Sequence, residues 1–217
     1  MDSLQEALTH LQANDVEKAL QLFITYAEEN PNDPVGYINA GNVLMQAKYY
    51  EQAENFFLKA IEKDEQAATA FYGMGNLYYT LEKHEQAVLM FQKALSLGLE
   101  DSDVYFMIGL SYIKQDNQIL ALPFLQRAIE LDNKDAQKLF QYGLALAKTG
   151  YLTEAESYFN QVLLQNDTHA DAMYNLALIK AEQENVLEAL ELLDKVLLQS
   201  PKHDLAKQAK STLQKSK

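Results

Sequence analysis

The chain contains 217 residues, of which 48% are hydrophobic and 23% charged, and 31 acidic against 18 basic residues give a net charge of −13 at pH 7. This apolar content excludes an intrinsically disordered chain, and the acidic excess argues against a protein that binds nucleic acid through its phosphates. Because cysteine is absent, disulfides, thiolate metal sites and cysteine nucleophiles are excluded as well.

The sequence shows no sign of export or of a membrane segment. The first residues, MDSLQEALTHLQANDVEKAL, are acidic and amphipathic, unlike a signal peptide. The most apolar run extends from Val104 to Ile113 and ends at Lys114, whereas a bilayer needs about 20 apolar residues. We therefore expect a soluble, cytoplasmic protein that makes no membrane contact.

The chain is organised by one constant spacing of 34 residues, which we call the repeat step. It separates four glycines and an alanine, namely Gly41, Gly75, Gly109, Gly143 and Ala177. It also separates the five alanines Ala53, Ala87, Ala121, Ala155 and Ala189, and the large residues Phe57, Phe91, Leu125, Phe159 and Leu193. Within each step, two groups of apolar residues follow the i, i+3, i+4, i+7 spacing of a buried helical stripe. Each step therefore predicts two helices joined by a turn.

In chain order, six such repeats are predicted at residues 1–33, 34–67, 68–101, 102–135, 136–169 and 170–203, followed by a closing helix at 204–217. The fold class is therefore all-α. The repeat length and its recurring small residues resemble the tetratricopeptide repeat (TPR) family, and residues 68–97 resemble its consensus best. The resemblance implies a single domain over residues 1–217, built as a right-handed superhelical solenoid in which each repeat contacts only its neighbours.

Three places in the chain depart from the repeat pattern. Positions within a repeat are counted from Pro34 and its equivalents, which are position 1. In repeat 1, Leu8 is predicted to fill the small-residue slot of position 8, and the turn between the helices is predicted to be one residue short. Pro123 is expected to kink the second helix of repeat 4 or to delay its start. Lys180 stands at position 11, where the other repeats have leucine or tyrosine.

The sequence contains no catalytic or metal-binding constellation. The histidines His10, His84, His169 and His203 are scattered over different repeats, without a second ligand on the same helix face. No glycine-rich phosphate loop and no serine-nucleophile turn are present. We therefore predict a protein that is not an enzyme and that has no cofactor and no metal site.

The other face of the first helices holds the candidate partner-binding residues. Positions 2, 5, 6, 9, 12 and 13 fall within about 120° of arc, away from the buried stripe. Repeats 2 and 3 place Ile38, Asn39, Asn42, Met45, Tyr72, Asn76 and Tyr79 there. Repeats 4 to 6 add Phe106, Met107, Leu110, Ile113, Phe140, Gln141, Leu144, Tyr174, Asn175 and Leu178. In stacked helix pairs this face lines the concave groove, although residues at positions 5 and 12 could instead pack between repeats.

An apolar floor with amide side chains suits an extended peptide, because amides bond both the N–H and the C=O of a backbone. TPR proteins that capture acidic C-termini use a carboxylate clamp of lysines and asparagines. Here the amide positions of that clamp are matched by Asn39, Asn42, Asn76 and Asn175, but its cations are missing, and only Lys114 and Lys148 supply positive charge at the groove edge. The predicted partner is therefore a protein or peptide segment that is extended, apolar and neutral to basic, rather than acidic.

The function predicted from these features is that of a scaffold or adaptor that binds a peptide segment or helix of its partner. Two alternatives remain open. The first is self-association that buries the groove between copies, and the second is a peptide-sensing regulator, although the repeats leave no room for an effector domain. The acidic first repeat and the basic closing helix are further candidates for a docking surface.

Overall fold

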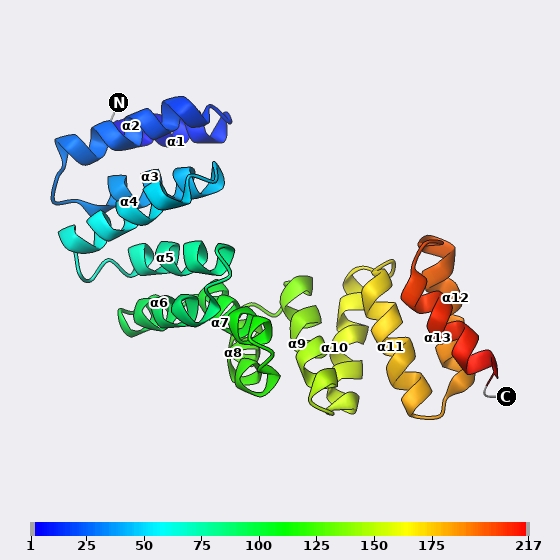
Figure 1. Cartoon of the computed structure of the whole chain (residues 1–217). Helices are drawn as coiled ribbons and strands as arrows, with labels where there is room; N and C mark the ends of the chain where they lie inside the picture. Colours follow the sequence, from blue (N-terminus) through cyan, green and yellow to red (C-terminus); the bar gives the residue numbers. More distant parts are fainter. Residues whose placement is uncertain (1–2, 216–217) are drawn as a thin grey trace. The chain divides into compact units, whose positions relative to one another are not determined.

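The computed structural model describes residues 3–215, which form thirteen helices and no strand (Figure 1). The helices are α1 (Ser3–Gln12), α2 (Val16–Glu29), α3 (Pro34–Gln46), α4 (Tyr50–Lys63), α5 (Ala68–Thr80), α6 (His84–Ser96), α7 (Ser102–Lys114), α8 (Gln118–Leu131), α9 (Ala136–Lys148), α10 (Leu152–Gln165), α11 (Ala170–Glu182), α12 (Val186–Gln199) and α13 (Asp204–Lys215). The predicted all-α class is confirmed. None of these helices combines the length and the apolar character that a membrane crossing requires.

The chain divides into two compact bodies, with the division between Gln115 and Asp116. The first body contains α1–α7 and the second α8–α13. Within each body every helix packs against the next one in sequence, and α3 also contacts α5 as α9 contacts α11. Contacts that stay within a repeat or reach only the adjacent repeat are the pattern of a repeat protein. A single domain over residues 1–217 stays a prediction.

A buried ring explains why small residues recur on the first helices. Phe57 of α4 is fully buried, and a Cβ built on Gly41 of α3 or Gly73 of α5 would lie 2.8 or 2.5 Å from its Cε1 atom. The contact recurs within two further repeats, between Gly75 and Phe91 and between Gly143 and Phe159. A Cβ at Gly41, Gly73 or Gly75 would overlap the ring, and one at Gly143 would contact it tightly, because interiors are close-packed. The expectation that position 8 needs a small residue is thus explained by the aromatic residue of the second helix.

The turn that follows the first helix of each repeat has one fixed geometry. One residue in each turn has a positive φ of 56–88°, and these residues follow one another at the repeat step: Asn14, Lys48, Glu82, Asp116, Gly150 and Glu184. In repeat 2 the Lys48 N–H donates to the Met45 carbonyl at 3.0 Å and the Tyr49 N–H donates to the Leu44 carbonyl at 2.8 Å. This pair of bonds is a Schellman motif, which favours glycine at its left-handed residue. Only repeat 5 meets that preference, with Gly150.

In repeat 1 the register of the first helix differs from the one expected. The second helix begins at Val16, exactly one repeat step before Tyr50, and the turn at 13–15 is as long as the one at 47–49. Ala7 is fully buried whereas Leu8 is partly exposed. The predictions that Leu8 fills the small-residue slot and that this turn is one residue short are therefore wrong, since Ala7 is the equivalent of Gly41.

The three leucines that suggested the wrong register have a different place. By the repeat step, Leu4, Leu8 and Leu11 are equivalent to Ile38, Asn42 and Met45 of α3. All three are partly buried and pack at the edge of the cluster that contains Ala7 and Phe23. They therefore continue, on α1, the face on which the candidate binding residues lie.

Pro123 does not delay the start of its helix. The second helix of repeat 4 begins at Gln118, which lies one repeat step after the first residue of α6. Pro123 lies inside α8, and both Pro123 and Ile119, whose carbonyl has lost its N–H donor, are exposed. Water can serve that carbonyl, which lowers the cost of the missing bond.

Lys180 has a partner in the preceding helix pair. Its Nζ donates to Glu156 Oε1 on α10 at 2.5 Å and lies 3.6 Å from Glu188 Oε2 on α12. The hydrogen bond from Lys180 lowers the pKa of Glu156. The same two positions of the repeat carry Tyr78 and Glu54, where the phenol donates to Glu54 Oε1 at 2.8 Å. A polar residue at position 11 is thus accommodated wherever the preceding repeat offers a carboxylate.

Glycine at the left-handed turn residue of repeat 3 is expected to stabilise the protein. Glu82 is exposed and has a φ of +58°, a conformation that costs an L-residue about 1–2 kcal/mol and that glycine adopts freely. After the larger chain entropy of glycine is subtracted, Glu82→Gly should raise the free energy of unfolding by about 1 kcal/mol in urea titrations. The matched control Gly150→Ala should lower it by about the same amount. Loss of stability in Glu82→Gly would contradict the argument.

The bond between Tyr78 and Glu54 predicts an unusual tyrosine titration. Burial, together with the bond to Glu54, raises the pKa of Tyr78 from its ordinary value of 10.0 to about 12. Because the neutral phenol is favoured in the folded state, its contribution to stability is complete below pH 10.0 and is lost as the pH rises to about 12. The tyrosinate absorbance of the protein minus that of Tyr78→Phe should therefore show one group that ionises near pH 12.

Glu54→Gln is the control for this titration, because it removes the charge that disfavours the phenolate. The pKa of Tyr78 should fall in this variant. A difference spectrum that already titrates at the ordinary pKa of 10.0 in the unsubstituted protein would contradict the prediction.

Candidate functional site

The structure brings the candidate binding residues together in two sets, one in each body. In the first body α3 contacts α5, and α5 contacts α7. These helices carry Ile38, Asn39, Asn42, Met45, Tyr72, Asn76, Tyr79, Phe106, Met107, Leu110 and Ile113. In the second body the contacting helices α9 and α11 carry Phe140, Gln141, Leu144, Tyr174, Asn175 and Leu178. We call these residues the groove face of each body.

Burial divides the groove face into residues that serve the core and residues that remain accessible. Ile38 and Phe106 are only 7% and 8% exposed, so at these two position-5 residues the packing alternative fits. Leu178 is 39% exposed, and the other members lie between these extremes. A ligand can therefore contact most of the face, but Ile38 and Phe106 mainly support it from below.

Ring contacts hold the accessible aromatic residues in place. The centroid of Tyr72 lies 5.7 Å from that of Phe91, and Phe140 lies 5.8 Å from Phe159. On its other side Phe140 contacts the ring of His169 at 4.8 Å. Tilted ring pairs at such distances are favourable, so these side chains form a fixed rather than an adaptable floor.

Two of the histidines cap helices, a role that was not predicted from the sequence. His169 Nδ1 accepts a hydrogen bond from the Ala172 N–H at 3.2 Å, and His203 Nδ1 accepts one from the Ala206 N–H at 3.1 Å. Both thus cap the N-terminus of a first or closing helix, as the aspartates do in other repeats. Between residues 3 and 215 no group of three or more histidine, aspartate or glutamate side chains is arranged to hold a metal ion.

The amides of the groove face are not equivalent. Asn39 Nδ2 donates to the Val35 carbonyl at 2.9 Å, and Asn175 Nδ2 donates to the Asp171 carbonyl at 2.7 Å. Within the described chain the side chains of Asn42 and Asn76 have no hydrogen-bond partner, and both are partly exposed. These two residues stand at position 9 of the contacting helices α3 and α5, so the donors and acceptors of both amides are available to a ligand backbone.

The groove face of the first body contains a cavity of about 330 Å³ between α3 and α5. It is lined by Val35, Ile38, Asn39, Asn42, Thr69, Tyr72 and Gly73. Four of these were candidate binding residues, whereas Val35, Thr69 and Gly73 were not. Gly73 had a signal in the sequence, because it is the only glycine at position 6 of repeats 2–6.

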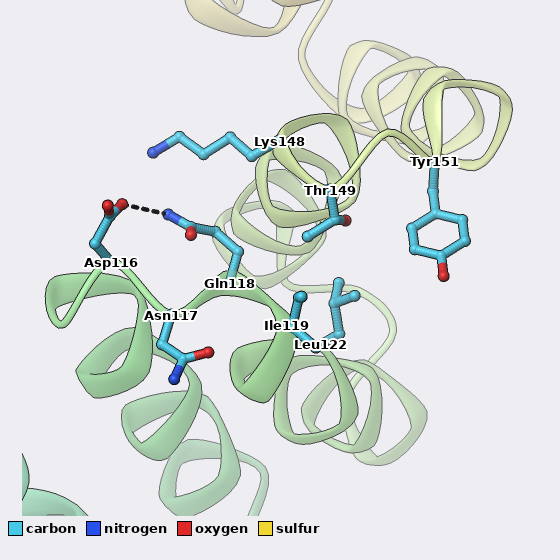
Figure 2. Close-up of a pocket in the computed structure, with 8 residues that line it drawn as sticks. All are labelled: Asp116, Asn117, Gln118, Ile119, Leu122, Lys148, Thr149 and Tyr151. Atoms are coloured by element: carbon cyan, nitrogen blue, oxygen red, sulfur yellow. Dashed lines mark hydrogen bonds between the residues drawn. The ribbon is translucent and has the colours of Figure 1, made fainter.

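A second cavity, of about 350 Å³, lies at the turns of the second body and is lined by no member of the groove face (Figure 2). It is lined by Asp116, Asn117, Gln118, Ile119, Leu122, Lys148, Thr149 and Tyr151. Gln118 Nε2 donates to Asp116 Oδ1 at 3.1 Å, and the Asn117 side chain caps α8. The wall is therefore made by groups that already serve the turns, although Ile119 and Tyr151 are well exposed.

Truncation of the buried and of the exposed members of the groove face should separate their roles. Phe106→Ala should lower the free energy of unfolding by about 3–5 kcal/mol, because it empties a buried site. Leu178→Ala, at an exposed site, should cost less than about 1 kcal/mol. Urea unfolding followed by far-UV circular dichroism measures both values. Equal losses in the two variants would contradict this division of the face.

Sequence and structure comparisons give one consistent answer. Family models described as tetratricopeptide repeat match residues 4–68, 68–97, 102–135 and 146–213. Comparison with curated proteins gives no significant match.

Among solved structures, the chain is similar to YrrB, described as a TPR protein with an unusual peptide-binding site. The two are 44% identical with a TM-score of 0.81, over 87% of this chain and 97% of YrrB. It is also similar in fold to Pseudomonas aeruginosa PilF, at 18% identity and a TM-score of 0.82, over 99% of this chain and 96% of that one. A structure of MamA matches at 19% identity and a TM-score of 0.71, over 78% and 92% of the two chains. The resemblance seen in the sequence is thus confirmed: this chain is a member of the tetratricopeptide repeat family, with the all-α solenoid fold of that family.

Proposed function

We propose that this protein is a non-catalytic scaffold or adaptor that binds an extended peptide segment or a helix of a partner protein on its groove face. The observation that carries the proposal is the largely apolar cavity of the first body, which is lined by the unpartnered amide of Asn42. The unpartnered amide of Asn76 stands one repeat step further along, on α5. YrrB, which is described as having a peptide-binding site, supports it by its 44% identity. The TPR fold generally serves protein–protein interaction.

The amides supply the contacts that an extended backbone needs. Asn42 and Asn76 each offer an N–H donor and a carbonyl acceptor, and they stand one repeat apart on α3 and α5. A peptide backbone laid across these helices would form hydrogen bonds with both amides. A ligand that is apolar throughout would displace the water from the amides and leave their hydrogen bonds unreplaced. The face therefore favours a peptide backbone over a purely apolar ligand.

The charge of the groove face argues against a partner that presents a terminal carboxylate. None of the residues that line the cavity between α3 and α5 is charged. An ionised carboxylate would lose its hydration there without a charged donor in return, at a cost of about 1.5–3 kcal/mol for each missing charged hydrogen bond. Neutral to basic segments avoid this cost. The proposal includes a cytoplasmic location, with which a chain free of cysteine is compatible.

Loss of the two free amides should weaken peptide binding. Peptides selected from a displayed random library on the unsubstituted protein serve as probes, with affinity measured by fluorescence anisotropy. Asn42→Ala combined with Asn76→Ala should weaken binding at least tenfold, which corresponds to about 1.4 kcal/mol, because each loses a pair of backbone contacts. The thermal unfolding of the variant should stay unchanged, since neither amide bonds to another described part of the protein.

The matched control is Asn55→Ala combined with Asn160→Ala, which removes two exposed amides from the second helices α4 and α10. This variant should bind the selected peptides normally. If the control loses affinity as the groove variant does, or if the groove variant binds unchanged, the groove face is not the binding site. Light scattering of the free protein tests the alternative in which copies of the chain cover the face.

A further inference from the structure

We propose that the cavity between α3 and α5 is a side-chain pocket that receives one large apolar residue, of the leucine or phenylalanine class, from an extended partner segment that carries basic residues on either side. The inference rests on the proposed function, because it names what the groove face of the first body selects. It adds a specificity site to a surface that otherwise recognises only a backbone.

Gly73 lines the pocket, and residue 73 can carry no side chain. The equivalent position 6 holds Asn39, Met107, Gln141 and Asn175 in the other repeats from repeat 2 onward. At Gly73, a Cβ would lie 2.5 Å from Cε1 and 2.9 Å from Cζ of Phe57, whose ring is fully buried. The core therefore excludes a side chain at Gly73, so residue 73 contributes only backbone to the wall of the cavity.

The walls of the pocket fit an apolar side chain. Val35, Ile38 and Tyr72 supply its apolar surface, and Ile38 is almost completely buried beneath it. The Asn39 amide is held by the Val35 carbonyl, which fixes one wall. The volume of about 330 Å³ is at the small end of ligand sites, which range from about 300 to 1,000 Å³. A single anchoring side chain of the partner, with its adjoining backbone, matches that size.

The charge around the pocket selects the residues that flank the anchor. Residues 1–115 contain 17 acidic against 7 basic residues. Aspartates lie at the start of the helices that bound the pocket or neighbour it, with Asp33 capping α3 and Asp101 capping α7. A field of one sign raises the local concentration of oppositely charged ligands and speeds their association. Lysine or arginine beside the anchor is therefore favoured, and glutamate or aspartate is disfavoured.

A panel of short peptides tests the pocket directly. The probes are fluorescein-labelled, C-terminally amidated peptides of the form Lys-Ser-X-Ser-Lys, in which X is leucine, phenylalanine, glycine or glutamate, and a version of the leucine peptide with both lysines replaced by glutamate. Anisotropy should show the leucine and phenylalanine peptides binding at least tenfold more tightly than the glycine and glutamate peptides. The leucine peptide with glutamate flanks should bind at least tenfold more weakly than its lysine counterpart.

A substitution at the mouth of the pocket links this preference to the site. Thr69 is exposed and lines the cavity, so Thr69→Trp should cover the opening and reduce the affinity for the leucine peptide to that for the glycine peptide. Thr69→Arg is the second variant, which places a cation at the mouth and should act in the same direction. Gln137→Trp is the matched control, because Gln137 is the exposed position-2 residue of α9 in the other body. It should leave all affinities unchanged.

The outcomes separate this inference from the proposed function. If the panel binds without regard to X, but loses binding in the variant that lacks the Asn42 and Asn76 amides, the groove binds peptides and the pocket is overturned. If Thr69→Trp keeps the preference for leucine, or if Gln137→Trp abolishes it too, the pocket is overturned as well. Failure of both this panel and the displayed library to bind the unsubstituted protein would overturn both proposals. Self-association that Thr69→Trp removes would show that a second copy is the occupant and would also overturn the inference.

Discussion

The rest of the structure depends on one contact, in which an aromatic ring of a second helix is wedged between the first helices of its own and the next repeat. Phe57 makes this contact with Gly41 and Gly73, and fully buried large side chains recur at the same position in the later repeats. Because the ring reaches the backbone of both first helices, the helices approach closely and in a fixed register. Stacking then follows from contacts between neighbouring repeats.

This wedge also shapes the surface on which we expect a partner to bind. Residues at position 8 of the first helices face the ring of their own repeat, and positions 5 and 12 lie next to them, whereas positions 6 and 9 lie farther round the helix. The rings at position 5 are supported by the second helices, as in the contact of Phe140 with Phe159. At Gly73 the core and the groove face meet, because Phe57 leaves no room for a Cβ at a residue that also lines the cavity. The same contact thus contributes both to stability and to the specificity that we propose.

Departures from the repeat pattern are compensated locally, by partners that lie in a neighbouring helix pair. Lys180 looked misplaced at a position of leucine and tyrosine, yet Glu156 on α10 pairs with it. The sequence could not indicate this pair, because the two residues are 24 positions apart and belong to different repeats. The register of the first repeat was predicted wrongly for a related reason. Leu4, Leu8 and Leu11 have the spacing of a buried stripe, but the residue that packs in the core is Ala7.

The sequence by itself determined the fold class, the helix pairs, their length and the family. The reason is that apolar residues at helical spacing, repeated at a constant step, predict helix pairs that bury their apolar faces by stacking on one another. It also placed the candidate residues on one side of the first helices, since helical geometry fixes which positions share a face. Only the tertiary structure decided which of them are buried, as Ile38 and Phe106 are, and which amides remain free. It alone revealed the cavity that Gly73 lines, because the residues that form this cavity come from two different helices, α3 and α5.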